Sequence, residues 1–438
     1  MGTFWSTTTT RGAPAVALAD LSTEELAAFM QLQRAAYDEL KLRGLKLDVT
    51  RGKPSAQQLD LSNGLLDLPD GFVAADGTDT RNYGGLLGLT ELREIFAELL
   101  GVNLDQLTAQ GNSSLTLMQQ VLVGCLLHGA VDSERPWSAE GTIKFICPVP
   151  GYDRHFALLN SFGIEMVPVP MHEDGPDADK IAALVKDDPS IKGMWVVPTY
   201  ANPTGDTVTE EVAAKLLAMP TAAPDFKIFW DNAYALHHLT QVETKSVDVI
   251  SLAASSGNPH RPIMFASTSK ITFAGAGVAF LAASTENITW YLKHLGLSSI
   301  GPDKVNQLRH AQFFKDAGGV REHMRAHAQI IAPKFDAVER ILTERLAEHD
   351  IARWTTPIGG YFVSLDVLPG TASRVVELAK EAGIALTPAG SSYPLGNDPD
   401  DENIRLAPTM PPLEEVEVAM DGVATCVLLA AGEYLTSH

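Results

Sequence analysis

Four short segments of the chain carry side chains that can do chemistry on a small ligand. They are residues 202–205 (NPTG), 230–234 (WDNAY), 267–270 (STSK) and 403–408 (NIRLAP). A lysine amine attacks carbonyl groups, and a guanidinium takes a carboxylate in a two-pronged fork. Each segment alone has a plainer interpretation, because N-P-x-G is a common turn and an aspartate after a strand can cap a helix. Their occurrence in one fixed order is far more specific than any single motif.

The first three segments directly follow runs that we expect to be buried strands, at 193–197, 227–230 and 262–266. An aspartate that ends a buried parallel strand, such as Asp231, lies at the edge of the sheet where ligands bind. Strand-like runs alternate with helix-like stretches, which predicts a mostly parallel sheet covered by helices on both faces. The other expected strands are residues 143–147, 164–168 and 278–282, and helices are expected at 89–100, 114–127, 177–186 and 210–219.

The rest of the chain predicts a second, smaller α/β unit. Ser22 opens a capping box, so an amphipathic helix is expected from there to about residue 43, ending at Gly44. Beyond residue 304 the pattern is mainly helical. We expect a long helix at 321–349, a strand at 361–367, a helix at 372–381, short strands at 384–387 and 404–407, and a last helix from residue 413.

Composition narrows the classes of function. The chain has 438 residues and a formal net charge of −21, which repels phosphate backbones and anionic membranes, so we expect neither nucleic acid nor membrane as a partner. Three cysteines without C-x-x-C spacing favour a reducing, cytoplasmic location. The pair His237-His238 lacks acidic or cysteine partners at metal-ligand spacing, and no metal site is expected.

Taken together, the four segments resemble those of class I (fold-type I) pyridoxal-phosphate aminotransferases. Four further segments are similar to an atypical bacterial branch of aspartate aminotransferases, which is also similar to aminotransferase-like domains fused to some transcription regulators. Those segments are residues 47–54 (LDVTRGKP), 81–85 (RNYGG), 147–156 (CPVPGYDRHF) and 269–278 (SKITFAGAGV).

The resemblance implies a role for each residue around the cofactor, pyridoxal 5′-phosphate. Lys270 matches the lysine that holds the cofactor as a Schiff base and moves the proton. Asp231 matches the acid that keeps the pyridine nitrogen protonated, so that the ring can act as an electron sink. Asn202 and Tyr234 match the donors to the phenolic oxygen, and Tyr152 matches the aromatic residue that stacks on the ring.

The phosphate group is expected to bind amides and hydroxyls. Ser113 and Ser114 open a helix whose N-terminal amides can face an anion, and Ser267 and Ser269 add hydroxyls. Tyr83 matches a residue that reaches the phosphate of the neighbouring subunit, which implies a homodimer with shared active sites. The chain departs from the family pattern at Val278, where common members carry an arginine that neutralises the phosphate.

For the substrate, Arg405 matches the arginine whose fork takes the α-carboxylate. Gly52 would let the backbone approach the substrate closely. No motif identifies the partner of a second carboxylate, for which Arg51, Lys53 and Arg154 are the candidates. His155, beside Tyr152, is expected to have a supporting or solvent-facing role rather than to transfer protons.

The implied activity is transfer of an amino group between L-aspartate and 2-oxoglutarate in a ping-pong cycle. Other substrates, either aromatic amino acids or alanine, and a cofactor-binding sensor without catalysis are the alternatives. The implied architecture is a large cofactor-binding domain over residues 61–325, with a sheet of the seven-stranded type. A small domain is expected over 326–438, with 21–60 as its N-terminal part and residues 1–20 as a flexible leader.

Overall fold

A computed structural model of the chain describes residues 17–438. Most of the predicted leader, residues 1–16, lies outside the described residues. Leu18–Asp20 forms a short 3-10 helix, in which Leu18 is buried and its N–H donates to the carbonyl of His349 at 3.0 Å. Residues 18–20 are therefore part of the folded chain and not of a flexible leader.

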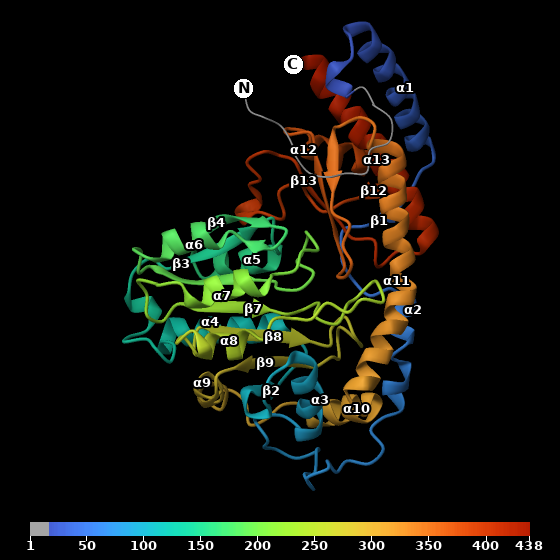
Figure 1. Ribbon diagram of the computed structural model, residues 1–438. Helices are drawn as coiled ribbons and strands as arrows, with labels where there is room; N and C mark the ends of the chain where they lie inside the picture. Colours follow the sequence, from blue (N-terminus) through green and yellow to red (C-terminus); the bar gives the residue numbers. More distant parts are fainter. Residues whose placement is uncertain (1–16) are drawn as a thin grey trace.

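One large sheet dominates the structure (Figure 1). Its strands lie in the order β2-β9-β8-β7-β6-β3-β4-β5, and the contacts between β8, β7, β6, β3 and β4 are all parallel. Strands β9, β2 and β5 join antiparallel. The strands are β2 (Leu107–Ala109), β3 (Lys144–Val149), β4 (Glu165–His172), β5 (Gly175–Pro176), β6 (Ile191–Val196), β7 (Lys227–Asp231), β8 (Pro262–Ser267) and β9 (Ala279–Ala283).

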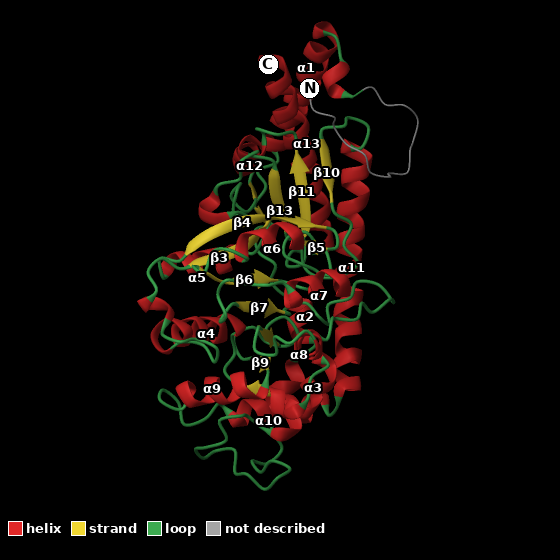
Figure 2. Cartoon of the chain, turned by 60° about the vertical axis from the view of Figure 1, so that its left-hand side comes forward, coloured by secondary structure: helices red, strands yellow, loops and turns green. Residues whose placement is uncertain are grey.

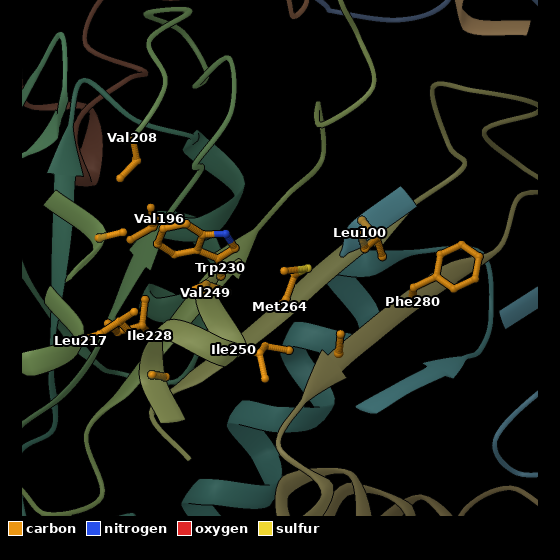
Figure 3. Packing of buried hydrophobic residues seen from close by; sticks show 14 of the residues in the cluster. Leu100, Val196, Val208, Leu217, Ile228, Trp230, Val249, Ile250, Met264 and Phe280 are labelled. Atoms are coloured by element: carbon orange, nitrogen blue, oxygen red, sulfur yellow. The ribbon is translucent and has the colours of Figure 1, made fainter. Parts of the chain in front are cut away.

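Helices cover both faces of this sheet because its strands alternate apolar side chains between the two sides. Along β7, Ile228 and Trp230 belong to one apolar cluster, and Phe229 between them belongs to another. Figure 3 shows Ile228 and Trp230 packed with Val249 and Met264 in the first cluster. That face is covered by α3 (Thr90–Leu100), α6 (Ala178–Val185), α7 (Glu210–Ala218), α8 (Val249–Ser255) and α10 (Lys304–Phe314), and the other face by α4 (Ser114–His128), α5 (Asp153–Ser161) and α9 (Thr285–Leu295).

A second unit contains both the N-terminal helix and the C-terminal part of the chain. Its three-stranded antiparallel sheet has the order β10-β11-β13, and β1 pairs in parallel with β12. Helix α11 runs along the molecule from the large sheet to this unit, as Figures 1 and 2 show. The elements are α1 (Thr23–Leu42), β1 (Leu47–Asp48), α11 (Ala317–Leu346), β10 (Ala352–Trp354), β11 (Val363–Val367), α12 (Ala372–Glu381), β12 (Ile384–Ala385), β13 (Asn403–Leu406) and α13 (Leu413–Ser437). The short helix α2 (Ala56–Asp60) lies against α11.

Helix α13 is long and apolar enough to cross a membrane by length and composition alone. In the structure, however, 72% of its most apolar window is buried inside the protein, where the helix packs against α1, α11 and α12. Its apolar character is therefore accounted for by its place at the centre of the second unit.

The predicted α/β class is confirmed, and the predicted strands and helices lie within a few residues of their expected bounds. The capping box at Ser22 is present and begins α1. The large sheet has one strand more than expected, because the two-residue β5 folds back on β4. The short strands β2 and β10 and the helices α2, α5, α8 and α9 were not among the predicted elements, whereas α10 begins where the pattern was expected to become mainly helical.

Candidate active site

A cavity of about 300 Å³ lies at the carboxyl ends of the parallel strands. Strands β6, β7 and β8 each end at it, and the segment after β3 and the N-terminus of α4 complete its wall. This is the edge of the sheet at which open α/β folds bind ligands. The cavity is lined by Asn112, Ser113, Ser114, Leu115, Met118, Tyr152, Val197, Asn202, Asp231, Ala233, Tyr234, Ser267, Ser269, Lys270 and Ala274.

Lys270 lies in the turn that follows β8. Its amine is 4.9 Å from the centre of the Tyr234 ring. Burial lowers the pKa of the Lys270 amine below its usual value, and the nearby Asp231 carboxylate opposes part of this shift. A lysine with a lowered pKa has more of the neutral amine, which is the form that attacks a carbonyl group.

Asp231 is the last residue of β7 and is buried. Its Oδ2 lies 3.0 Å from Nε2 of His155, a residue of α5 that stacks on Trp195 at a centroid distance of 4.2 Å. Oδ1 of Asp231 is also buried, yet it has no hydrogen-bond partner among the described residues. A buried carboxylate oxygen without a donor is costly, so this atom is suited to bind a protonated ligand group.

Three more predicted residues surround this carboxylate. Asn202 follows β6, and its Oδ1 accepts a hydrogen bond from Arg405 at 3.4 Å, which leaves its side-chain N–H groups free to donate elsewhere. Burial raises the pKa of Tyr234 well above its usual value, so its hydroxyl keeps its proton and can donate. Burial likewise raises the pKa of Tyr152 to about 12, and the Tyr152 ring forms part of the cavity wall.

The opposite end of the cavity carries hydroxyls and the start of a helix. Ser113 is the N-cap of α4, and Ser114 is its first residue. Ser267 Oγ donates to Ser269 Oγ at 3.0 Å, and Ser269 Oγ donates to the carbonyl of Asn112 at 3.2 Å. The N-terminus of a fifteen-residue helix with four hydroxyls beside it fits a phosphate group.

The departure at Val278 has a structural explanation. Its side chain is buried in the large apolar cluster, and its N–H donates to Thr268 Oγ1 at 2.9 Å. Among the described residues that line the cavity, Lys270 is the one cation. A phosphate bound here would therefore be held by amides and hydroxyls of this chain.

Arg405 comes from β13 of the second unit and is buried at the side of the cavity. Its Nη1 donates to Asp153 Oδ1 at 2.9 Å, and its guanidinium lies 5.2 Å from the centre of the Phe362 ring. Its Nε is buried and has no partner within residues 17–438. Part of the fork is therefore available to a carboxylate.

Like Arg405, the predicted residues Gly52, Lys53 and Tyr83 are not among those that line the cavity. A Cβ added to Gly52 would meet the Phe362 ring, so the close approach at Gly52 is to this ring. The same ring lies against the Arg405 guanidinium. Lys53 is exposed, and its carbonyl accepts from Thr409 Oγ1 at 3.0 Å. Tyr83 is 81% exposed, so a contact with a neighbouring subunit remains a prediction.

His155, expected in a supporting or solvent-facing role, is buried and contacts Asp231, which is a supporting role. Two residues at the site were not predicted as part of it: Asp153 pairs with Arg405, and Phe362 supports the guanidinium. His155 lies three residues after Tyr152, at the start of α5, and residues three apart lie on the same side of a helix. This spacing was the sequence signal that His155 reaches the site.

The chain is similar to known proteins over nearly its whole length. The family model described as aspartate amino-transferase matches residues 21–438. The chain belongs to the aspartate aminotransferase family. An aspartate aminotransferase of Corynebacterium glutamicum is 59% identical over 421 residues, which cover 96% of this chain and 97% of that protein.

Solved structures of aminotransferases agree with this assignment. An aspartate transaminase from Corynebacterium glutamicum superposes with a TM-score of 0.95 at 58% identity, covering 96% of this chain and all of the other. An α-aminoadipate aminotransferase from Thermus thermophilus, complexed with N-(5′-phosphopyridoxyl)-L-leucine, has a TM-score of 0.70 at 21% identity and covers 94% of this chain and all of its own. The second likeness is one of fold alone. The aminotransferase assignment and the fold-type I architecture that the motifs implied are thus confirmed.

Proposed function

We propose that this aminotransferase binds pyridoxal 5′-phosphate in the cavity and moves the amino group between L-aspartate and 2-oxoglutarate, giving oxaloacetate and L-glutamate. The observation that carries the proposal is the pairing of Lys270 with Asp231 in one cavity, where Asp231 Oδ1 is buried and lacks a partner among the described residues. The printed names of the similar corynebacterial proteins support aspartate as the amino donor.

The residues present fit this cofactor. Asp231 Oδ1 can accept from the protonated pyridine nitrogen, and Ser113, Ser114, Ser267 and Ser269 can hold the phosphate. When bound, the cofactor supplies an electron sink for the carbanion that forms at the substrate Cα. Asn202, Tyr234 and Tyr152 would hold the ring by donors to its phenolic oxygen and by stacking, which are expectations from the family resemblance.

Lys270 and Arg405 would perform the two tasks that the substrate requires. The buried Lys270 amine, with its lowered pKa, can take a proton at one position and release it at another. Arg405 can bind the α-carboxylate with the N–H groups that Asp153 and Asn202 do not occupy. The substrate is then held by its carboxylate while its amino group faces Lys270.

A second carboxylate needs a further cation, for which we propose Arg154. Arg154 lies in the first turn of α5, two residues after the cavity-lining Tyr152, and its charge opposes part of the rise that burial causes in the pKa of Tyr152. Hydrogen bonds from Thr50 lower the pKa of Asp48, and the charges of Lys53 and Arg51 lower it further, so these two cations act on that exposed carboxylate. Arg154→Gln should raise the KM for aspartate much more than the KM for alanine. Arg51→Gln and Lys53→Gln should leave the ratio of these two KM values unchanged.

We also propose a homodimer with shared active sites. Tyr83 is a large, exposed aromatic residue, and the family resemblance implies that it reaches the phosphate of the neighbouring subunit. Light scattering of the purified protein would show twice the chain mass. Tyr83→Phe should weaken cofactor binding without altering that mass, and a monomer with full activity would contradict the proposal.

Initial rates with a panel of amino donors test the substrate assignment. L-aspartate and L-glutamate should give the highest kcat/KM, with 2-oxoglutarate and oxaloacetate as their acceptors. A preference for alanine or phenylalanine would replace the substrate assignment but keep the chemistry. Cofactor binding without turnover of any donor would favour the sensor alternative instead.

A further inference from the structure

The backbone carbonyl of Lys270 is held by side chains from distant parts of the chain. Lys270 lies in a turn, and no backbone N–H of residues 17–438 pairs with its carbonyl. Tyr361 Oη donates to this carbonyl at 3.3 Å, and His237 Nε2 lies 3.4 Å from it. The position of the reacting lysine in its turn therefore depends on groups outside the turn.

The direction of the Tyr361 hydrogen bond is fixed by Gln58. The capping box that begins α2 makes Ser55 N–H donate to Gln58 Oε1 at 3.0 Å, so the other side-chain atom of Gln58 is the amide nitrogen, a donor. That nitrogen donates to Tyr361 Oη at 2.9 Å. The Tyr361 hydroxyl accepts from Gln58 and is thereby left to donate its own proton to Lys270.

Gln58 and Tyr361 are both fully buried, and Gln58 has a second link. Gln58 Nε2 also lies 3.0 Å from His327 Nδ1 on α11. His323, one turn away on the same helix, lies 2.8 Å from the carbonyl of Ile271, the residue after Lys270. Tyr361, which Gln58 of α2 holds in turn, and His323 of α11 thus contact consecutive carbonyls of the lysine turn.

The same segments extend to the substrate side of the cavity. Tyr361 is followed by Phe362, which lies against the Arg405 guanidinium and meets Gly52. A shift of the segment that leads into β11 when a carboxylate binds Arg405 would also move the Tyr361 hydroxyl.

We propose that Gln58 and Tyr361 form a positioning pair, which fixes the Lys270 backbone so that the amine faces the cofactor. This inference rests on the proposed function of Lys270. Neither residue lines the cavity, so the pair acts through Lys270 and not on the substrate.

Two variants break this link in different ways. Tyr361→Phe removes the hydroxyl and keeps the ring. Gln58→Glu keeps the size and the acceptor for Ser55, but it replaces the amide donor with an acceptor, so the Tyr361 proton turns away from Lys270. Tyr291→Phe is the matched control, because Tyr291 is also a buried tyrosine and its hydroxyl donates to Gln120 at 2.7 Å on another side of the molecule.

Three measurements separate positioning from stability. The pH titration of the visible absorption band of cofactor-loaded protein should shift its midpoint in both variants. The value of kcat should fall about 10- to 100-fold, as small misplacements of a catalytic group do, with KM changed by less than about twofold. Competitive amine labelling of cofactor-free protein should show an altered reactivity of Lys270 relative to the surface lysines. Tyr291→Phe should alter none of these, whatever its melting temperature.

The proposal is overturned if folded Tyr361→Phe or Gln58→Glu protein keeps the wild-type midpoint, kcat and Lys270 labelling. If Tyr361→Phe does not fold, Gln58→Glu decides alone. Failure of the proposed function looks different, since the wild-type protein itself would then lack the visible band. In that case the labelling of Lys270 still tests the positioning pair.

Discussion

Replacing Arg405 by lysine isolates the contribution of the guanidinium fork. Lysine keeps the positive charge but is a point donor on a flexible stem, so it cannot present two parallel N–H groups. In the structure the Arg405 guanidinium is fixed by Asp153 at 2.9 Å, by Asn202 at 3.4 Å and by the Phe362 ring. A lysine would keep at most one of the hydrogen bonds and would lie less firmly on the ring.

The expected loss follows from one hydrogen bond to a charged group, which contributes about 1.5–3 kcal/mol. This corresponds to an increase of about 10- to 150-fold in the KM for the amino acid. Because every substrate carries an α-carboxylate, aspartate, glutamate and 2-oxoglutarate should all be affected to a similar extent. The visible band of the bound cofactor should remain, since Arg405 is not among the residues that line the cavity.

Steady-state kinetics of oxaloacetate formation, coupled to its reduction, measure this effect. Arg340→Lys is the control, because Arg340 lies on the surface and pairs with the exposed carboxylates of Glu344 and Glu417. Its KM should stay at the wild-type value. A wild-type KM in Arg405→Lys, with the protein folded and the cofactor bound, would refute the assignment of the fork.

Three other perturbations have defined outcomes. Gly52→Ala places a Cβ against the Phe362 ring, so KM should rise and the melting temperature should fall; unchanged values of both would contradict the contact. His155→Leu leaves the buried Asp231 without its partner, at a cost of about 1–3 kcal/mol, and cofactor affinity measured by equilibrium dialysis should fall; wild-type affinity would argue against this pairing. Burial lowers the pKa of Lys334 from 10.5 to about 8. Between pH 8 and 10 the unfolded chain therefore binds more protons than the folded protein, and the free energy of unfolding, measured with urea, should rise by about 2 kcal/mol. Lys334→Met should flatten that rise, and an equally steep rise in the variant would exclude Lys334 as its source.

The residues that could be predicted from the sequence are those that follow strands. Asp231 ends β7, Asn202 and Lys270 lie in the segments that follow β6 and β8, and the carboxyl ends of neighbouring parallel strands meet at one edge of the sheet. The alternation of buried strands with polar segments was therefore enough to predict that these three residues lie close together. Arg405 could be placed only through the family resemblance, because it reaches the cavity from the second unit.

Residues that act through tertiary contacts left no such pattern. Asp153 lies 252 positions from Arg405 in sequence, and Tyr361 lies 91 from Lys270. Their contacts depend on how the second unit is placed against the large sheet, and no periodicity records that placement. The antiparallel direction of β9 was equally hidden, since a buried strand has the same apolar composition in either direction.

Trapping the bound cofactor tests the central claim most directly. Purified protein is treated with borohydride, which reduces the link between lysine and cofactor to a stable bond, and its peptides are then analysed by mass spectrometry. We expect one modified peptide, with the phosphopyridoxyl group on Lys270, and no modification in Lys270→Ala. Modification of a different lysine, or a Lys270→Ala protein that still transfers the amino group of aspartate, would contradict this claim.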